Sequence, residues 1–465
     1  MSFDWLMANW FPCLSIFTID KGLPSSTWAY ILSLTIIFYP IIKVSFGYFS
    51  PSRLKNTISL YETYLKENEI DLLVNYISKY HIDDIKKYLQ GISHLPQKES
   101  IDIILRRRTD KDKAYEKLVK PQRVLFASWV YGHIIQNENF VRKSANKYPE
   151  LFATAFSGME TKESSNEDLV KLFIECLFEN KNQLFIQELK IMNGTNSSVL
   201  EMNKNYDIPI LFSLFAHTKA AADNYVWYPV GEGAVRSLKH DTEQKEFLIR
   251  KYDHDLESEL WNQKIYIAIV YFNYMVRETI YRNSESHMWL FYFRHFTDLL
   301  IEIIPTPNDY DGDLEYLSFA HKMIYEQFSV MTDWLDLAKE QETDNRVIDT
   351  IRCLGWCVHS ICQADNSKIS VRFRRRLLDL LLSTYFEFSH YPDNIAAKTA
   401  RQWLERMFLN PKGVDFGTPI ITTEYLVALQ DAWDEFDKFP YQYHEGNGSI
   451  QHFVTTVLTP LRLNE

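Results

Sequence analysis

Glycine is scarce in this sequence. Only 14 of the 465 residues are glycine, less than half of the roughly 7% that is average for proteins. Tight hairpins and phosphate-cradling loops need glycine because their backbones adopt conformations that other residues disfavour, whereas helix interiors exclude it. The scarcity therefore argues against a fold rich in hairpins and favours one built from helices.

Cysteine is also sparse. The five cysteines are odd in number and scattered, which argues against a disulfide framework and fits free thiols in a reducing compartment. The densest group is Cys353, Cys357, His359 and Cys362, which we expect on one continuous helix. Four side chains from one helix cannot surround a tetrahedral zinc ion. The sequence therefore predicts no metal site.

Motifs for common cofactors are missing from the chain. It contains no Walker-type phosphate loop and no serine-nucleophile elbow, so the sequence predicts no cofactor. Acidic residues outnumber basic ones by 61 to 50, which gives a net charge of -11. This balance excludes broad nucleic-acid binding but leaves room for a local basic groove.

One long apolar run stands near the N-terminus. The stretch from Gly22 to Ile42 contains no charged residue, and its length fits the roughly 20 residues that a membrane-spanning helix needs. Trp28 and Tyr48 lie near its two ends, where aromatic rings favour the headgroup region. The sequence therefore predicts a transmembrane helix at about residues 25–46.

A shorter apolar segment at residues 5–19 is either interfacial or a second span. Basic residues follow the main span, among them Lys43, Arg53 and Lys55. Because basic residues flank spans on the cytoplasmic side, this bias predicts that the bulk of the chain is cytoplasmic. We therefore expect residues 1–52 to anchor the protein in the inner cell membrane, with membrane lipid as a partner.

Aromatic residues are abundant, with 28 Tyr and 30 Phe, and apolar residues recur at three- and four-residue spacing along the chain. This pattern predicts an all-α protein, in which rings fill the seams of a solenoid- or bundle-like cytoplasmic body. We expect a helical stalk and charged connector at residues 53–120 and the body at 121–465. The pattern suggests one internal division of the body, near residues 218–240.

The helical pattern is interrupted between His217 and His240. The stretch W-Y-P-V-G-E-G, Trp227 to Gly233, predicts an ordered loop there. After it, the spacing predicts one long helix from about Thr242 to Arg282.

The stretch Y-R-N-S-E-S-H-M-W, Tyr281 to Trp289, carries the best candidate for catalysis. Its arginine, asparagine and histidine resemble the R-x(4–6)-H pattern of HEPN ribonucleases. The resemblance implies that Arg282 stabilises charge on a scissile phosphate and that His287 moves protons. It also implies that Asn283 orients the phosphate or the histidine and that the reaction needs no metal. The alternative is structural: Arg282 ends one helix, and a nearby serine caps the next.

A second cluster, Arg372-Phe373-Arg374-Arg375-Arg376, heads an apolar helix. The arginines 372, 374, 375 and 376 either contact a ligand or phosphate, in a groove for RNA or a nucleotide, or are simply solvated.

The stretch W-L-F-Y-F-R-H-F, Trp289 to Phe296, is similar to the AbiC-type phage abortive infection family. The resemblance implies a role in phage defence. Our leading hypothesis is a membrane-anchored interaction or effector protein that acts through protein partners, with a homo-oligomer among the states that the sequence allows. The alternatives are a metal-independent HEPN-type ribonuclease, with RNA as its partner, and a lipid- or nucleotide-sensing regulator.

Overall fold

The computed structural model describes residues 51–85, 122–156, 167–193, 195, 197–283, 290–305, 316–344, 346–411, 422–438 and 447–462. Over these residues the chain is helical, with no strand and a single isolated bridge between Lys251 and Ser318. The all-α prediction is thereby confirmed. The predicted spans at 5–19 and 25–46 lie outside the described residues. Among the helices of the described residues, none has the length and apolar character of a membrane span.

The chain divides into two compact units, one formed by residues 1–69 and 93–129 and the other by residues 70–92 and 130–465. The first unit contains α3 (Pro51–Lys66) and most of α8 (Gln122–Val130). Within it, the rings of Tyr61 and Phe126 lie 6.3 Å apart, and Phe126 stacks on Trp129.

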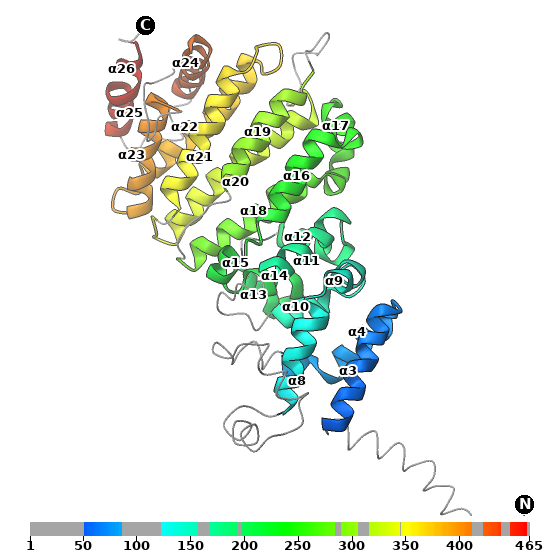
Figure 1. The fold of residues 1–465 in the computed structure, drawn as a ribbon. Helices are drawn as coiled ribbons and strands as arrows, with labels where there is room; N and C mark the ends of the chain where they lie inside the picture. Colours follow the sequence, from blue (N-terminus) through cyan, green and yellow to red (C-terminus); the bar gives the residue numbers. More distant parts are fainter. Residues whose placement is uncertain are drawn as a thin grey trace, which may run out of the picture. The chain divides into compact units, whose positions relative to one another are not determined.

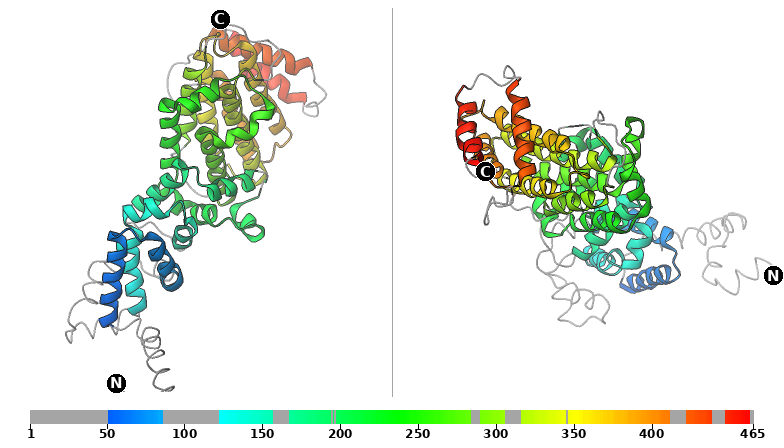
Figure 2. Two further views of the ribbon diagram at one scale, coloured as in Figure 1. Left: turned by 90° about the vertical axis from the view of Figure 1, so that its right-hand side faces the viewer. Right: turned by 90° about the horizontal axis from the view of Figure 1, so that it is seen from above.

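The second unit is built around two stacked layers of helices (Figure 1). The first layer contains α11 (Glu167–Glu179), α16 (Tyr228–His240), α19 (Phe291–Ile303), α21 (Val347–Gln363) and α23 (Ile395–Leu409). The second layer contains α12 (Gln183–Asn193), α18 (Lys264–Tyr281), α20 (Phe319–Glu340), α22 (Val371–Phe388) and α24 (Thr423–Lys438). Each helix packs against the next one in its layer, and Figure 2 shows the stack from the side and from above. This order of packed helix pairs is the arrangement of a solenoid.

Shorter helices complete the second unit. They are α4 (Ile70–Tyr80), α9 (Glu138–Ser144), α10 (Pro149–Phe156), α13 (Val199–Asn205), α14 (Pro209–Phe215), α15 (Thr218–Asp223), α17 (Thr242–Ile249), α25 (Asn447–Phe453) and α26 (Thr459–Arg462), with π-helical turns η2 (Tyr131–Ile135) and η5 (Val454–Leu458) and a 3₁₀ segment η3 (His254–Asn262). Helices α10, α13 and α15 all pack against α14.

Helix α18 forms the centre of the core. Most of its residues are buried between α16 and α20. Aromatic rings fill the seams as predicted: Phe272 stacks on Tyr292 at 5.8 Å, and Phe293 meets the edge of Trp334 at 5.3 Å. The indole N–H of Trp334 donates to the side-chain oxygen of Asn273 at 2.8 Å, so burial leaves this polar pair satisfied.

The loop predicted between His217 and His240 is wrong, because this segment forms α15 and α16. Glycine in α16 serves close packing instead of a turn. A Cβ atom on Gly231 would lie 2.3 Å from the ring of Tyr292, and one on Gly233 would lie 2.7 Å from the ring of Phe178. The two glycines therefore let α16 approach its neighbours in the first layer.

The long helix predicted from Thr242 to Arg282 is also wrong, since this range holds α17, η3 and α18. The chain is extended after α17, where Lys251 bridges to Ser318. The side chain of Asp253 then accepts a hydrogen bond from the N–H of Asp255 at 3.0 Å, which starts the 3₁₀ segment. Aspartate competes with helix hydrogen bonds in this way and so interrupts a periodic apolar pattern.

Several helices end in a motif that normally uses glycine. The left-handed residues just after five helix ends are Asn68, Lys181, Tyr225, Asn283 and Glu342. After α11, for example, the N–H of Lys181 donates to the carbonyl of Phe178 and that of Asn182 to the carbonyl of Leu177. These are the two bonds of a Schellman motif. The glycine-poor chain therefore adopts strained backbone at helix ends, at a cost of about 1–2 kcal/mol per residue.

Candidate functional site

The first predicted site lies at the C-terminal end of α18. Arg282 is the residue that follows the helix, and its Nε donates to Glu278 at 3.1 Å. Its side chain is 23% exposed, whereas that of Glu278 is 1% exposed. Glu278 also accepts the backbone N–H of Val199 at the start of α13. Burial raises the pKa of Glu278, and the nearby Arg282 cation opposes this shift.

Arg282 also contacts α14. Its Nη1 donates to the carbonyl of Ala216, the residue that ends this helix. A cation at a helix C-terminus is favourable because the unpaired carbonyls carry partial negative charge. Two of the three guanidinium nitrogens of Arg282, Nε and Nη1, thus have hydrogen-bond partners within the protein.

Asn283 adopts a left-handed conformation with φ of 47°. Its N–H donates to the carbonyl of Ile280, and its side-chain oxygen accepts from the hydroxyl of Thr343 at 3.3 Å. Asparagine tolerates this conformation better than most residues other than glycine. The contacts of Asn283 and of two of the three guanidinium nitrogens of Arg282 therefore fit a helix ending, whereas Nη2 of Arg282 is buried without a hydrogen-bond partner among the described residues.

The third residue of the predicted catalytic set, His287, lies outside the described residues, as does the serine cap expected beside it. The structure accordingly gives positions for Arg282 and Asn283 only, and the catalytic role of the three residues stays a prediction.

A buried carboxylate lies at the opposite end of α14. Glu188, on α12, accepts the N–H groups of Ile210 and Leu211 at 3.1 and 2.8 Å. Burial raises the pKa of Glu188 to about 7, and these two hydrogen bonds only partly oppose the shift. Helix α14 is thus held by an acidic side chain at its N-terminus and by Arg282 at its C-terminus.

The second predicted site, the arginine cluster, is divided by the fold. Arg374 is 1% exposed and points into the junction between α21 and α22. Its Nε donates to the carbonyl of Ile361 at 3.1 Å, and its two Nη atoms donate to Ala364 and Asn366. These contacts engage all three nitrogens with the C-terminus of α21. Arg374 therefore presents no surface to a ligand.

The other arginines of the cluster face outward. Arg372 is exposed, while Arg375 and Arg376 are half-buried. Arg375 lies 4.0 Å from Asp379. The guanidinium of Arg376 lies over the ring of Tyr316, at 4.7 Å from its centroid. Sequence alone does not separate these roles, because the partners of each arginine come from other helices.

The cysteines of α21 are buried among core residues, as the sequence predicts. Cys353 donates to the carbonyl of Leu290 at 3.1 Å, and its hydrogen bond with Cys357 together with burial raises its pKa. A high thiol pKa makes a cysteine unreactive. Among the described residues, no group of three or more His, Cys, Asp or Glu side chains is placed to hold a metal ion.

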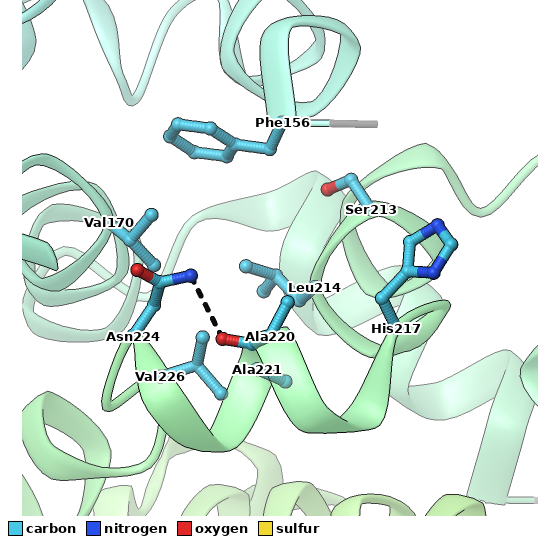
Figure 3. A pocket seen from close by; sticks show the side chains of 9 residues that line it. All are labelled: Phe156, Val170, Ser213, Leu214, His217, Ala220, Ala221, Asn224 and Val226. Atoms are coloured by element: carbon cyan, nitrogen blue, oxygen red, sulfur yellow. Dashed lines mark hydrogen bonds between the residues drawn. The ribbon is translucent and has the colours of Figure 1, made fainter. Parts of the chain in front are cut away.

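A small cavity of about 20 Å³ lies between α10, α14 and α15 (Figure 3). Its polar wall includes Asn224, which is 3% exposed and whose amide nitrogen donates to the carbonyl of Ala220 at 2.9 Å. Ser213 and His217 also line it, but the hydroxyl of Ser213 donates to the carbonyl of Ile210 at 2.7 Å. The cavity has room for about one water molecule. It is therefore too small to be a substrate site.

The first layer carries a surface feature that the sequence does not reveal. We call it the aromatic row, and its rings are Tyr225, Tyr228, Phe291, Trp356 and Trp403. Each step between neighbouring helices of the layer is bridged by one of these rings and a cation or a second ring. The bridging cations are Lys171, Arg294 and Arg352, and Arg406 contacts Trp403 within α23.

The contacts of the row are close. Lys171 on α11 lies 4.5 Å from the ring centroid of Tyr225, and the row continues through Trp227 to Phe291 on α19 at 6.2 Å. Arg294 then stacks on Trp356 at 4.1 Å. Tyr228 and Phe291 remain 45% and 44% exposed. These pairs join residues of different helices, so the periodicity of any one helix could not identify them.

At the last step of the row, two cations lie close to one ring. The guanidinium groups of Arg352 and Arg406 lie 5.2 and 4.9 Å from the centroid of Trp403. Spacing of an arginine and a tryptophan by one helical turn, as in Arg406 and Trp403, is the only part of this pattern visible in the sequence.

No family model, no curated protein and no solved structure matches this chain.

Proposed function

We propose that this protein is a membrane-anchored interaction or effector protein whose helical body binds a protein partner through the aromatic row. The observation that carries the proposal is the row itself, which crosses the first layer from α11 to α23. Half-exposed tyrosine, tryptophan and arginine side chains are enriched where proteins bind each other and account for much of the binding energy.

The charges of the row favour a protein over a nucleic acid. Three of its cations have a carboxylate close by: Lys171 with Glu167, Arg294 with Asp298 and Arg352 with Asp349. A nucleic-acid surface instead needs an excess of positive charge along the phosphate backbone. A phage-defence role remains part of the proposal and is supported only by the similarity of Trp289 to Phe296 to the AbiC-type family.

The contacts of Arg282 and Asn283 support the same proposal against the ribonuclease hypothesis. Both residues have structural partners at the ends of α18 and α14. A catalytic arginine needs donors directed at the transition state, whereas two donor positions of Arg282 are occupied by Glu278 and Ala216.

Site-specific photo-crosslinking tests the docking surface. A photoreactive residue at Phe291 or Trp356 should capture the same protein from cells that contain the native partner, and one at Glu340, an exposed position on α20 in the second layer, should not. Equal capture from Glu340, or no capture from the row, would overturn the proposal. The double substitution Phe291→Ala and Trp356→Ala should abolish capture, while Leu200→Ala, a similarly exposed apolar residue on α13, should not.

Fractionation tests the membrane anchor independently. We expect full-length protein in the membrane fraction and its release after deletion of residues 1–52, because the uncharged run from Gly22 to Ile42 is then lost. Full-length protein that stays soluble without detergent contradicts this part of the proposal and leaves the docking surface untouched.

A further inference from the structure

Three short helices, α13 to α15, follow one another in the chain and form what we call the 199–223 segment. They are seven, seven and six residues long, and helices of this length are not stable on their own in water. Helix α14 packs against α10 and α12 and against its two neighbours in the segment. The segment therefore depends on its contacts with the rest of the second unit.

Helix α14 has no cap of its own at its N-terminus. The residue before it is Ile208, whose side chain makes no capping hydrogen bond, so the first N–H groups of the helix need a partner from elsewhere. Glu188 on α12 is that partner, because it accepts the N–H groups of Ile210 and Leu211 at 3.1 and 2.8 Å. The side chain that caps α14 is therefore a titratable one.

Glu188 is fully buried, at 0% exposed, and no cation pairs with it among the described residues. The two N–H groups of α14 are its hydrogen-bond partners. The charged groups that act on it from neighbouring elements are Asp207, just before α14, and Glu150 on α10, and both are acidic. Desolvation, with a smaller contribution from these two carboxylates, raises the pKa of Glu188 to about 7.

Opening of the 199–223 segment returns the Glu188 carboxyl to water, where its ordinary pKa of 4.5 applies. Between these two values the closed segment keeps a proton that the open segment releases. The equilibrium therefore shifts toward the open form as pH rises from 4.5 to 7, and the shift is complete above the higher value. Below pH 4.5 both forms bind the proton, so closure is then favoured most.

The segment leads directly into the aromatic row. Tyr225 follows α15, and its N–H donates to the carbonyl of Ala222 at 3.1 Å in the turn that ends this helix. The Nζ atom of Lys171 lies 4.5 Å from the ring centroid of Tyr225, in the first contact of the row. The next residue, Val226, is held separately, because its carbonyl accepts the hydroxyl of the buried Tyr271 at 3.1 Å. Opening of α15 therefore disturbs the position of Tyr225 but not that of Val226.

We propose that the 199–223 segment is a proton-controlled element, which stays closed over Glu188 while this carboxyl carries a proton and opens more readily once the proton is lost. Opening weakens the contact between Lys171 and Tyr225, so the aromatic row is complete at lower pH and incomplete at higher pH. The opening depends only on the contacts described above, whereas its effect on partner binding rests on the proposed function.

Hydrogen–deuterium exchange of the full-length protein in neutral detergent tests the element without a partner. The quantity to compare is the protection factor, by which the fold slows exchange relative to an unstructured chain at the same pH. In the native protein, amides of residues 199–223 should be at least about tenfold less protected than those of α21, as local opening requires. Their protection should fall about 70-fold between pH 5 and pH 8, and this change should shrink below about threefold in Glu188→Gln.

Two variants serve as controls. Histidine side chains also change charge in this pH range, and His217 stands at the start of α15, so the first control is His217→Gln. The second is Glu243→Gln, which removes an exposed carboxylate on α17. Both should keep the pH dependence of the native protein.

Three outcomes overturn the proposal. The first is a 199–223 segment as well protected as α21, because its amides then exchange only through global unfolding. The second is protection of this segment that does not change between pH 5 and pH 8. Both are measured on the native protein and do not depend on how Glu188→Gln folds. The third is a control variant that loses the pH dependence as fully as Glu188→Gln does.

Discussion

At the junction of α21 and α22, the guanidinium of Arg374 donates hydrogen bonds only to neutral groups, whereas at the end of α18 that of Arg282 donates to a carboxylate as well as a carbonyl. Both arginines complete the C-terminus of a neighbouring helix. They differ in what balances the charge. Burial lowers the pKa of Arg374, because desolvation outweighs the opposing electrostatic effect of Cys362, Glu424 and Asp365.

Glu188 is the acidic counterpart of Arg374. It faces two backbone N–H groups at the start of α14, just as Arg374 faces carbonyls at the end of α21. Each of these charges is balanced by the partial charges of a helix end instead of a formal counterion. Arg282 and Glu278, in contrast, balance one another. Helix ends without a counterion should therefore be the more sensitive points of the fold.

The largest expected effect comes from Arg374→Met. It removes three hydrogen bonds that a buried guanidinium donates, to Ile361, Ala364 and Asn366, so we expect a loss of about 4 kcal/mol in the free energy of unfolding, measured with urea. Arg375→Met, whose side chain is half-exposed beside Asp379, should cost less than about 1 kcal/mol. Equal losses in the two variants would show that the carbonyl contacts of Arg374 do not stabilise the junction.

The next effect is the pH dependence caused by Glu188. Its pKa is about 7 in the folded protein and about 4.5 in the unfolded chain, so the folded state binds the extra proton between these values. Unfolding free energy should therefore rise as pH falls from 7 to 4.5 and decrease as pH rises through this window, by about 3 kcal/mol in total.

The measurement compares the native protein with Glu188→Gln at pH 5 and pH 8. The variant cannot titrate at this position, so the difference between the two proteins should change by about 2.5 kcal/mol over this interval. A difference that is the same at both pH values would mean that Glu188 titrates normally.

The Arg282–Glu278 pair should contribute less to the free energy of unfolding than the hydrogen bonds of Arg374. Arg282→Met leaves Glu278 buried without its cation, and we expect a loss of about 2 kcal/mol because the pair is partly exposed. In the background of Glu278→Gln the same substitution should cost less than about 1 kcal/mol. Equal costs in both backgrounds would show that the two side chains do not interact.

The ribonuclease hypothesis predicts that substitution of Arg282 also changes RNA cleavage, in addition to the free energy of unfolding. If Arg282 and His287 cut RNA, Arg282→Ala and His287→Ala should each lower cleavage about a hundredfold or more, and a chelator should have no effect. We expect the purified native protein to cut no RNA. Metal-independent cleavage that both substitutions abolish without unfolding the protein would establish the ribonuclease hypothesis instead.

Local pattern predicts this fold well where helices are long and periodic. The spacing of apolar residues predicts a helix from Ile395 to Leu409, and α23 has these bounds. The predictions fail where a contact between residues far apart in the sequence determines the local structure. The residues near Gly231 in the sequence do not show that the ring of Tyr292 packs against it. Without that contact, two glycines so close together indicate a loop.

The same limit applies to the candidate sites. Arg374 and Arg376 are two residues apart and chemically identical, yet one contacts carbonyls of α21 and the other the ring of Tyr316. Residue type predicts that a cation is present but cannot predict its partner. The Arg-Asn sequence at positions 282 and 283 shows the converse, because a catalytic motif and a helix ending require the same two residue types.

The smallest effect tests the scarcity of glycine itself. Lys181 and Glu342 both have left-handed backbone in Schellman motifs, with φ of 49° and 50°. Glycine adopts this conformation without the Cβ penalty, although it also loses more entropy on folding. We therefore expect Lys181→Gly and Glu342→Gly each to raise the free energy of unfolding by about 0.5–1 kcal/mol. Lys181→Ala and Glu342→Ala are the controls, since alanine keeps the strain while removing the side chain, and they should give no gain. If the alanine variants gain as much stability as the glycine variants, the charged side chain and not the left-handed backbone destabilises these helix ends.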